Sequence, residues 1–299
     1  MARDMDRPKD IDVAGIRTRY YDEGAGEPVV FIYGGNFGSD TSAPSAQCWD
    51  TVFGPLSERF RVIALDKLGQ GYTDNPRRDE DYTMAAVVRH ATDFIRALDL
   101  PPVHLVGHSR GGYAAARLVL EAQHLVRSLT IVNSGTLTPG VSTNEVVLSR
   151  CPHPPYTRES ARWIYEGYCF KPEMVTKDWI DVVYDVMQQP KHRETVAKMV
   201  GEQLLVTQFL PALARDKRET LGWIEEGRLQ RPTQVIWGFN DRTIEPRYGI
   251  DLFNLLAAHE RRTTLSIFNE AGHFPYREHP HRFAAQMTRF IDGVAGGRA

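Results

Sequence analysis

The clearest structural signal in this 299-residue chain is the decapeptide Val103-His104-Leu105-Val106-Gly107-His108-Ser109-Arg110-Gly111-Gly112. Its first four residues predict a buried strand, and the alanine-rich segment at residues 111–122 predicts a helix. The serine between them stands in the pattern G-x-S-x-G. A strand that turns sharply into a helix at such a serine lifts the hydroxyl above the sheet, and small neighbours let other backbone approach it. The decapeptide therefore predicts a strand-turn-helix unit with Ser109 at the turn.

Strand and helix patterns alternate on both sides of this unit. Short apolar or β-branched runs predict strands at residues 16–21, 28–33, 61–66, 103–107, 128–133, 233–237 and 263–268. Helix-spaced apolar residues predict helices at residues 82–99, 111–122, 248–259 and 280–294. A glycine turn at residues 24–26 suggests that the first two strands form a pair. The predicted fold class is α/β, a mostly parallel sheet with helices on both faces.

The alternation stops between the strands at 128–133 and 233–237. Residues 136–218 contain no β-rich run, and prolines interrupt several helix-like stretches. We therefore expect a core domain formed by residues 1–135 and 219–299, with residues 136–218 inserted into it as a helical lid.

Composition restricts the partners and the compartment. The chain has 38 acidic and 36 basic residues, a balance that produces no field for attracting nucleic acid or an anionic membrane. Three cysteines at unrelated spacings indicate neither a disulfide framework nor a zinc site. No apolar run reaches the length of a membrane span. We expect a cytoplasmic protein that acts on a small molecule without a cofactor or metal; homo-oligomerisation stays open.

Two further polar residues follow strands on the carboxyl side of the predicted sheet. Asp241 comes shortly after the strand at 233–237, and His273 follows the strand at 263–268. Open α/β sheets gather their functional side chains at this edge. A neutral serine needs a base in hydrogen-bond reach and an acid that orients the base. The sequence predicts Ser109 as nucleophile, His273 as general base and Asp241 as the orienting acid.

Other histidines and acids are weaker candidates for these roles. Core or surface positions suit the histidines of the other predicted strands and helices, which are His90, His104, His124, His192 and His259. His108 lies in the same turn as Ser109, so it is expected to shape the pocket rather than act as base. Asp66 ends a strand and is expected to brace the turn that contains Gly69 and Gly71.

An acyl-transfer intermediate also needs backbone N–H donors for its oxyanion. One is expected from Arg110, the residue after the nucleophile. The other is expected from the glycine loop that follows the strand at 28–33, at either Gly35 or Asn36.

Together these residues resemble the α/β-hydrolase superfamily over nearly the whole chain. Asp66-Lys67-Leu68-Gly69-Gln70-Gly71-Tyr72 is similar to the superfamily's aspartate-glycine turn, and Trp237-Gly238 with Asp241 and Pro246 is similar to its acid loop. Within the superfamily, the chain is most similar to the meta-cleavage-product hydrolases, whose lid helices the segment 156–189 resembles. The resemblance implies hydrolysis of a carbon-carbon bond in a vinylogous diketo acid.

Three features depart from that narrower pattern. Those enzymes typically have asparagine before the nucleophile and tryptophan after the catalytic histidine, where this chain has His108 and Phe274. They also carry a lid arginine, where this chain has a stretch with Asp181 and Asp185. Ester hydrolases that split monoalkyl esters of phthalate resemble this chain too.

The leading hypothesis is a carboxylesterase-type serine hydrolase that acts on a small, aromatic substrate. The alternatives are carbon-carbon hydrolysis by the same triad and a non-catalytic ligand receptor on the same fold. Aromatic residues of the insertion suit packing and pocket lining equally well. The predicted substrate-binding residues are Phe37, His108, Arg162, Trp163 and Phe274, and Arg110 and Arg162 are candidates to meet a substrate carboxylate.

Overall fold

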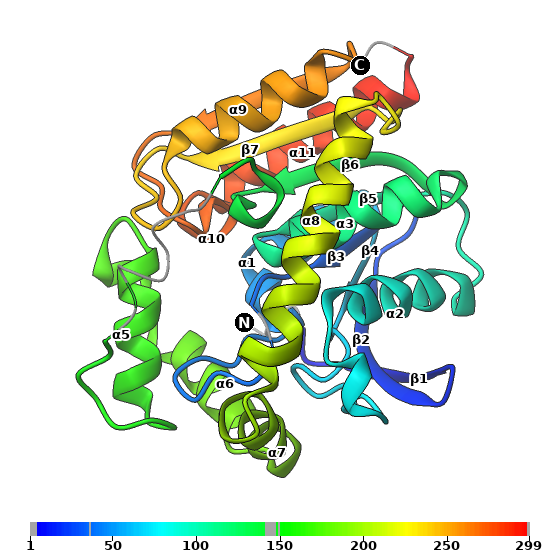
Figure 1. The fold of residues 1–299 in the computed structure, drawn as a ribbon. Coiled ribbons are helices and arrows are strands. Elements are labelled where there is room, and N and C mark those ends of the chain that lie inside the picture. Colours follow the sequence, from blue (N-terminus) through cyan, green and yellow to red (C-terminus); the bar gives the residue numbers. More distant parts are fainter. Residues whose placement is uncertain (1–4, 36, 141–147, 149, 298–299) are drawn as a thin grey trace.

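The computed structural model describes residues 5–35, 37–140, 148 and 150–297 (Figure 1). Its centre is an eight-stranded sheet with the strand order β1-β2-β4-β3-β5-β6-β7-β8. The strands are β1 (Lys9–Val13), β2 (Ile16–Glu23), β3 (Pro28–Ile32), β4 (Arg61–Leu65), β5 (Val103–His108), β6 (Val126–Val132), β7 (Thr233–Gly238) and β8 (Thr263–Phe268). β1 and β2 run antiparallel to their neighbours, and all later pairs are parallel. The predicted fold class is thereby confirmed.

The predicted pairing of the first two strands was wrong. β2 pairs with β1 and β4, whereas β3 pairs with β4 and β5, so β4 lies between the two strands that the glycine turn connects. The sequence reasoning missed β1, a charged edge strand with only Val13 fully buried. Once β1 supplies the antiparallel partner of β2, the apolar β3 is available for the middle of the parallel sheet.

Both faces of the sheet are covered, because residues of the central strands alternate between two apolar cores. In β3, Val30 and Ile32 belong to one core, and Val29 and Phe31 belong to the other. The helices over the first core are α2 (Met84–Ala97), α3 (Arg110–Glu121), α8 (Leu210–Glu225) and α9 (Pro246–Ala257). The helices over the second core are α1 (Asp50–Ser57), α10 (Pro275–Glu278) and α11 (Pro280–Ala295).

The connection between β6 and β7 contains most of the remaining helices. They are α5 (Arg158–Tyr168), α6 (Lys177–Met187), α7 (Pro190–Val196) and two π-helical segments, Ala197–Gly201 and Leu205–Phe209. Figure 1 shows α5, α6 and α7 gathered beyond one edge of the sheet. Helix α8 continues through residue 218, so the expected boundary between lid and core falls inside one helix. The division into a lid and a core stays a prediction.

No helix in the described part of the chain combines the length and apolar character needed to cross a membrane.

Candidate active site

Ser109 occupies a strained turn between β5 and α3. Its backbone has φ 53° and ψ −125°, a conformation that costs a non-glycine residue about 1–3 kcal/mol. Close backbone packing explains its glycine neighbours. A Cβ at Gly107 would lie 2.3 Å from the carbonyl oxygen of Gly111, and one at Gly111 would lie 2.2 Å from that of Ile32. The turn therefore needs the small residues of the G-x-S-x-G pattern.

Asp241 and His273 follow the ends of β7 and β8 and meet in a buried hydrogen bond. His273 Nδ1 lies 2.7 Å from Asp241 Oδ2. Because Nδ1 donates its proton to the carboxylate, the neutral ring keeps Nε2 as its basic nitrogen. Burial alone would raise the pKa of Asp241, but the charge of His273 and hydrogen bonds from His273, Thr243 and Asn133 hold that pKa below its ordinary value. The arrangement keeps Asp241 ionised and His273 oriented.

Asn133 is a residue of the candidate site that the sequence reasoning missed. It follows β6, and its side-chain Nδ2 donates to Asp241 Oδ2 at 2.7 Å while its Oδ1 accepts from the backbone N–H of Gly238 at 3.1 Å. The side chain thus ties the carboxylate to the end of β7. Its position after a central strand was the available signal, because Asp241 and His273 were identified by the same criterion.

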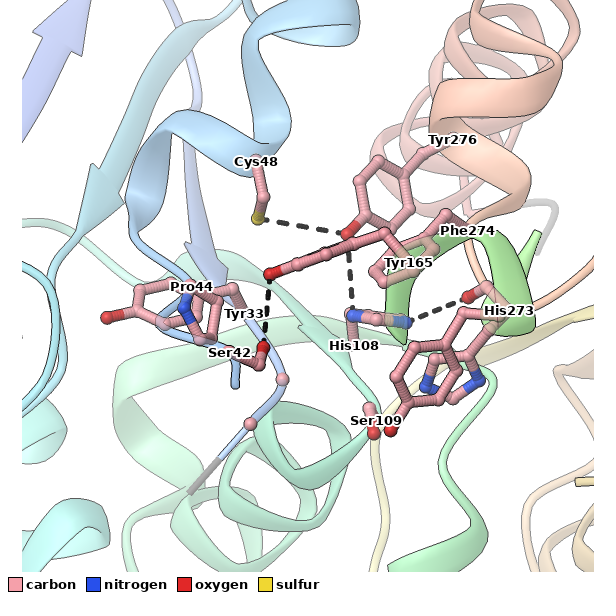
Figure 2. Close-up of a pocket in the computed structure, with 13 residues that line it drawn as sticks. Tyr33, Ser42, Pro44, Cys48, His108, Ser109, Tyr165, His273, Phe274 and Tyr276 are labelled. Atoms are coloured by element: carbon pink, nitrogen blue, oxygen red, sulfur yellow. Dashed lines mark hydrogen bonds between the residues drawn. The ribbon is translucent and has the colours of Figure 1, made fainter. Parts of the chain in front are cut away.

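Ser109 and His273 line one cavity of about 60 Å³ (Figure 2). The thirteen lining residues include no lysine, arginine, aspartate or glutamate, and they are Tyr33, Gly34, Gly35, Ser42, Pro44, Cys48, His108, Ser109, Tyr165, Tyr168, His273, Phe274 and Tyr276. Typical ligand pockets measure about 300–1,000 Å³, so this cavity suits one small, uncharged part of a substrate.

A chain of neutral polar groups forms one wall of this cavity (Figure 2). His108 Nε2 donates to the carbonyl oxygen of His273 at 2.9 Å, and Tyr276 Oη lies 3.4 Å from His108 Nδ1 and 3.7 Å from Cys48 Sγ. Burial, followed by the charge of His273, lowers the pKa of His108 well below its ordinary value. Burial raises the pKa of Cys48 to about 12. The wall therefore remains uncharged at neutral pH.

The end of α5 packs directly against the histidine loop. The ring of Tyr168 stacks on His273 with the centroids 4.7 Å apart, and the carbonyl oxygen of Tyr168 accepts the backbone N–H of His273 at 2.8 Å. The buried carboxylate of Glu278 accepts backbone N–H groups from Phe170 and from Gly272, both at 2.6 Å. Burial raises the pKa of Glu278. These contacts join the inserted helices to the loop that carries His273.

The glycine loop after β3 lies against Ser109. Gly35 lines the cavity with φ 76°, and a Cβ at Gly34 would lie 2.7 Å from the Cβ of Ser109. The loop that contains Gly35 therefore lies beside Ser109, and the oxyanion role of Gly35 stays a prediction. Asn36 lies outside the described residues. Arg110 begins α3, as expected for the second donor.

The predicted substrate-binding residues divide into two groups. His108 and Phe274 line the cavity. Phe37, Arg162 and Trp163 do not: Phe37 is buried against Tyr82 and Phe209, and Arg162 Nη1 donates to the carbonyl oxygen of Val175 at 2.9 Å.

The expected role of Asp66 is confirmed, because its oxygens accept the backbone N–H groups of Ala46 at 2.7 Å and Tyr72 at 2.9 Å. Of the histidines expected to have core or surface roles, His90, His104 and His192 are buried and His124 and His259 are exposed.

Known proteins resemble this chain along nearly its whole length. A 2-hydroxymuconate semialdehyde hydrolase from Pseudomonas sp. (strain CF600) is 29% identical over 286 residues, which cover 95% of this chain and 93% of the relative. A 2-hydroxy-6-oxo-2,4-heptadienoate hydrolase from Pseudomonas putida is 27% identical over 281 residues, which cover 93% of each protein.

Solved structures show the same resemblance. A variant of a meta-cleavage product hydrolase matches with a TM-score of 0.78 at 25% identity, covering 97% of this chain and 98% of the other. A putative lipase from Acinetobacter baumannii AYE matches with a TM-score of 0.74 at 20% identity, covering 97% of this chain and 92% of the other; at that identity the match shows the fold alone. The expected resemblance to meta-cleavage-product hydrolases is confirmed.

The model of the alpha/beta hydrolase family matches residues 29–286. The eight-stranded sheet and the strained serine turn between β5 and α3 agree with that match. The chain belongs to the alpha/beta hydrolase family.

Proposed function

We propose that this enzyme hydrolyses a carboxylic ester of a small, aromatic substrate through an acyl-enzyme. Ser109 Oγ attacks the ester carbonyl carbon while His273 Nε2 takes the serine proton. The resulting oxyanion is stabilised by the backbone N–H groups of Gly35 and Arg110. Collapse of the intermediate expels the alkoxide, which His273 protonates. His273 then activates a water molecule that releases the acid and restores Ser109.

The neutral cavity beside Ser109 is the observation that carries this proposal. A substrate carboxylate placed there would meet no cationic side chain among the described lining residues. Burying an ion without a partner costs several kcal/mol. An uncharged alcohol group or ring has no such cost, and the apolar and neutral polar surface of the cavity is complementary to it.

Arg110 is our candidate for binding a carboxylate elsewhere on the same substrate. It follows Ser109 directly and begins α3, and its guanidinium lies 5.8 Å from the ring centroid of Phe209, on the insertion. Arg162 is the weaker candidate, because it also pairs with Glu166 at 3.4 Å. A monoalkyl phthalate, which combines an aromatic ring, one ester and one carboxylate, fits this arrangement and is the compound to test first.

Carbon-carbon hydrolysis is the second candidate, and the relatives favour it. Their names describe hydrolases of 2-hydroxymuconate semialdehyde and of 2-hydroxy-6-oxo-2,4-heptadienoate. Ser109, Asp241 and His273 are equally compatible with that reaction. It requires the dienoate carboxylate to be bound outside the neutral cavity.

A direct comparison of substrates distinguishes ester hydrolysis from carbon-carbon hydrolysis. Purified enzyme is assayed with monoethyl phthalate, diethyl phthalate and 2-hydroxymuconate semialdehyde. We expect kcat/KM for the better ester to exceed that for the semialdehyde by at least about tenfold, which corresponds to about 1.4 kcal/mol of transition-state preference. A higher kcat/KM for the semialdehyde would replace the ester assignment with carbon-carbon hydrolysis.

Two arginine variants serve as the matched pair in the same assay. Arg110→Leu should raise KM for the monoester by about tenfold or more and leave the diester nearly unchanged, because only the monoester has a carboxylate to lose its partner. Arg162→Leu should leave both substrates unchanged. Equal effects of Arg110→Leu on the two esters would exclude Arg110 as the carboxylate ligand.

A further inference from the structure

Lys67 is a fully buried lysine directly behind the glycine loop. Its side chain is 1% exposed, and its Nζ donates to the carbonyl oxygens of Gly34 at 2.7 Å and Gly35 at 2.9 Å. Nζ also lies 4.6 Å from the centroid of the Tyr33 ring. Lys67 forms no ion pair with a carboxylate of the described residues. It is therefore a buried amino group held mainly by two neighbouring backbone carbonyls.

The geometry of the peptide bond gives these two contacts a direction. In a trans peptide the C=O and N–H groups point in opposite directions, and the described chain has no cis peptide. The carbonyl of Gly34 points at Lys67, so the N–H of Gly35 in the same peptide points away from Lys67. Gly34 itself lies against Ser109, and Gly35 lines the cavity. An N–H that points away from Lys67 can therefore face the cavity that Gly35 lines.

We propose that Lys67 is a positioning residue, whose Nζ holds the Gly34–Gly35 peptide so that the N–H of Gly35 meets the oxyanion formed at Ser109. The role rests on the proposed function and adds a group that does not touch the substrate. The hydrogen bond from Nζ to the carbonyl of Gly34 also strengthens this N–H as a donor, because it polarises the same amide.

The energetic cost of Lys67 supports a role beyond packing. Burial, followed by the charge of Arg110, lowers the pKa of Lys67 well below its ordinary value. Smaller contributions from Cys48 and Asp66 raise that pKa. The oxygens of Asp66 are already engaged by backbone N–H groups of Ala46 and Tyr72. A methionine would fill the same space without burying an ionisable group. The chain instead has a lysine behind a loop that contacts Ser109.

The test compares transition-state binding with ground-state binding. In Lys67→Met we expect kcat to fall about 10²-fold while KM changes by less than about threefold, as for loss of one oxyanion donor. Affinity for a trifluoromethyl ketone, which forms a tetrahedral oxyanion on Ser109, should fall by a similar factor. Affinity for the product acid should stay within about threefold. Lys67→Gln retains a side-chain N–H donor on a shorter side chain and should show an intermediate loss.

Lys217→Met is the matched control. Lys217 on α8 also donates to a glycine carbonyl, that of Gly140 at 2.9 Å, and burial lowers its pKa too. Gly140, unlike Gly34 and Gly35, does not line the cavity. This variant should retain wild-type kcat. Circular dichroism and thermal unfolding show whether each variant is folded; if Lys67→Met is not, Lys67→Gln decides.

Two results would overturn the role of Lys67: kcat within threefold of wild type in the folded variant, or an equal loss of affinity for the ketone and for the product acid. Fluorine NMR of the ketone adduct keeps the experiment independent of the substrate. One combination of results would reject the ester assignment alone: wild type forms the ketone adduct, Ser109→Ala does not, and no ester is hydrolysed. The effect of Lys67 on adduct formation can still be measured in that case.

Discussion

Among single residues, Asp241 has the most fully occupied hydrogen-bonding environment of the site. Its Oδ1 accepts from Thr243 N, Thr243 Oγ1 and Ile244 N at 2.7–3.0 Å, and its Oδ2 accepts from Asn133 and His273. Five donors leave the carboxylate no freedom to rotate. A buried carboxylate so satisfied can hold the imidazole in one tautomer and stabilise the imidazolium that forms during reaction.

The proposed triad predicts a specific pattern of losses. Ser109→Ala and His273→Ala should each lower kcat by at least about 10³-fold on the best ester found, with a much smaller effect on thermal stability. Steady-state kinetics and thermal unfolding of the purified variants provide the measurement. His124→Ala, at an exposed histidine far from the cavity, is the control and should retain full activity. Wild-type turnover in either triad variant would remove that residue from the mechanism.

At the scale of elements, the site depends on how closely the ends of β3 and β5 approach. The glycine loop after β3 contacts the serine turn after β5, and these strands are parallel neighbours in the sheet. The carboxyl ends of adjacent parallel strands lie at one edge, so two loops 70 or more positions apart in sequence meet there. Helix α5 and Glu278 then attach the histidine loop to the same edge.

This close approach predicts the effect of adding one methyl group. In Gly34→Ala the new Cβ would lie 2.7 Å from the Cβ of Ser109 and 3.1 Å from His108 Nδ1, so the loop must shift. We expect kcat to fall by about tenfold or more, because a displaced loop no longer aligns its N–H donor. Kinetics with the best ester measure the loss.

Gly222→Ala is the control for that substitution. Gly222 lies in α8, and a Cβ there meets nothing within 4 Å. Replacement of a helical glycine by alanine should stabilise the protein by about 0.5–1 kcal/mol and leave kcat unchanged. If Gly34→Ala also kept full activity, close contact between the glycine loop and Ser109 would not matter for catalysis.

For the whole molecule, buried neutral histidines link stability to pH. Burial lowers the pKa values of His90 and His192 to about 4, and it also lowers those of His104 and His108. In the unfolded chain these groups titrate near 6.5. Between pH 6.5 and about 4 the unfolded state therefore binds more protons than the folded state. The histidine contribution to stability is complete above pH 6.5 and is lost as the pH falls.

His90 allows this effect to be isolated. Its Nε2 bonds Thr18 Oγ1 at 2.8 Å, on the far side of the sheet from the cavity. We expect the difference in the free energy of unfolding between wild type and His90→Asn to shrink by about 2 kcal/mol from pH 7.5 to pH 5, because only wild type carries this titration. Urea unfolding at both pH values measures it. A difference that is independent of pH would mean that His90 titrates normally when folded.

Local sequence patterns were sufficient to predict most of the helices and strands and to select the three proposed triad residues. β8 begins and ends where its β-branched run predicts, and α2, α3, α9 and α11 lie within about two residues of their predicted bounds. The spacing of apolar residues that distinguishes a strand from a helix involves only neighbouring residues, so it can be recognised in a single sequence. Ser109, Asp241 and His273 could be proposed as a triad because parallel strands place their following loops at one edge.

Contacts between distant segments required the tertiary structure. The position of β4 between β2 and β3 depends on strand pairing, which no local pattern specifies. Arg162 and Phe37 have residue types suited to a pocket, but the paths of α5 and of the loop after β3 place them elsewhere.

Asn133, Glu278 and Lys67 have ordinary surroundings in the sequence. Apart from the bond between Gly272 and Glu278, which spans six positions, the hydrogen bonds that involve them join residues 32 to 108 positions apart. The sequence by itself therefore determined the family and was enough to propose the triad, because these depend on local period and motif. Which groups support those side chains was decided only by tertiary packing, since a buried polar group takes whichever partner folding brings to it.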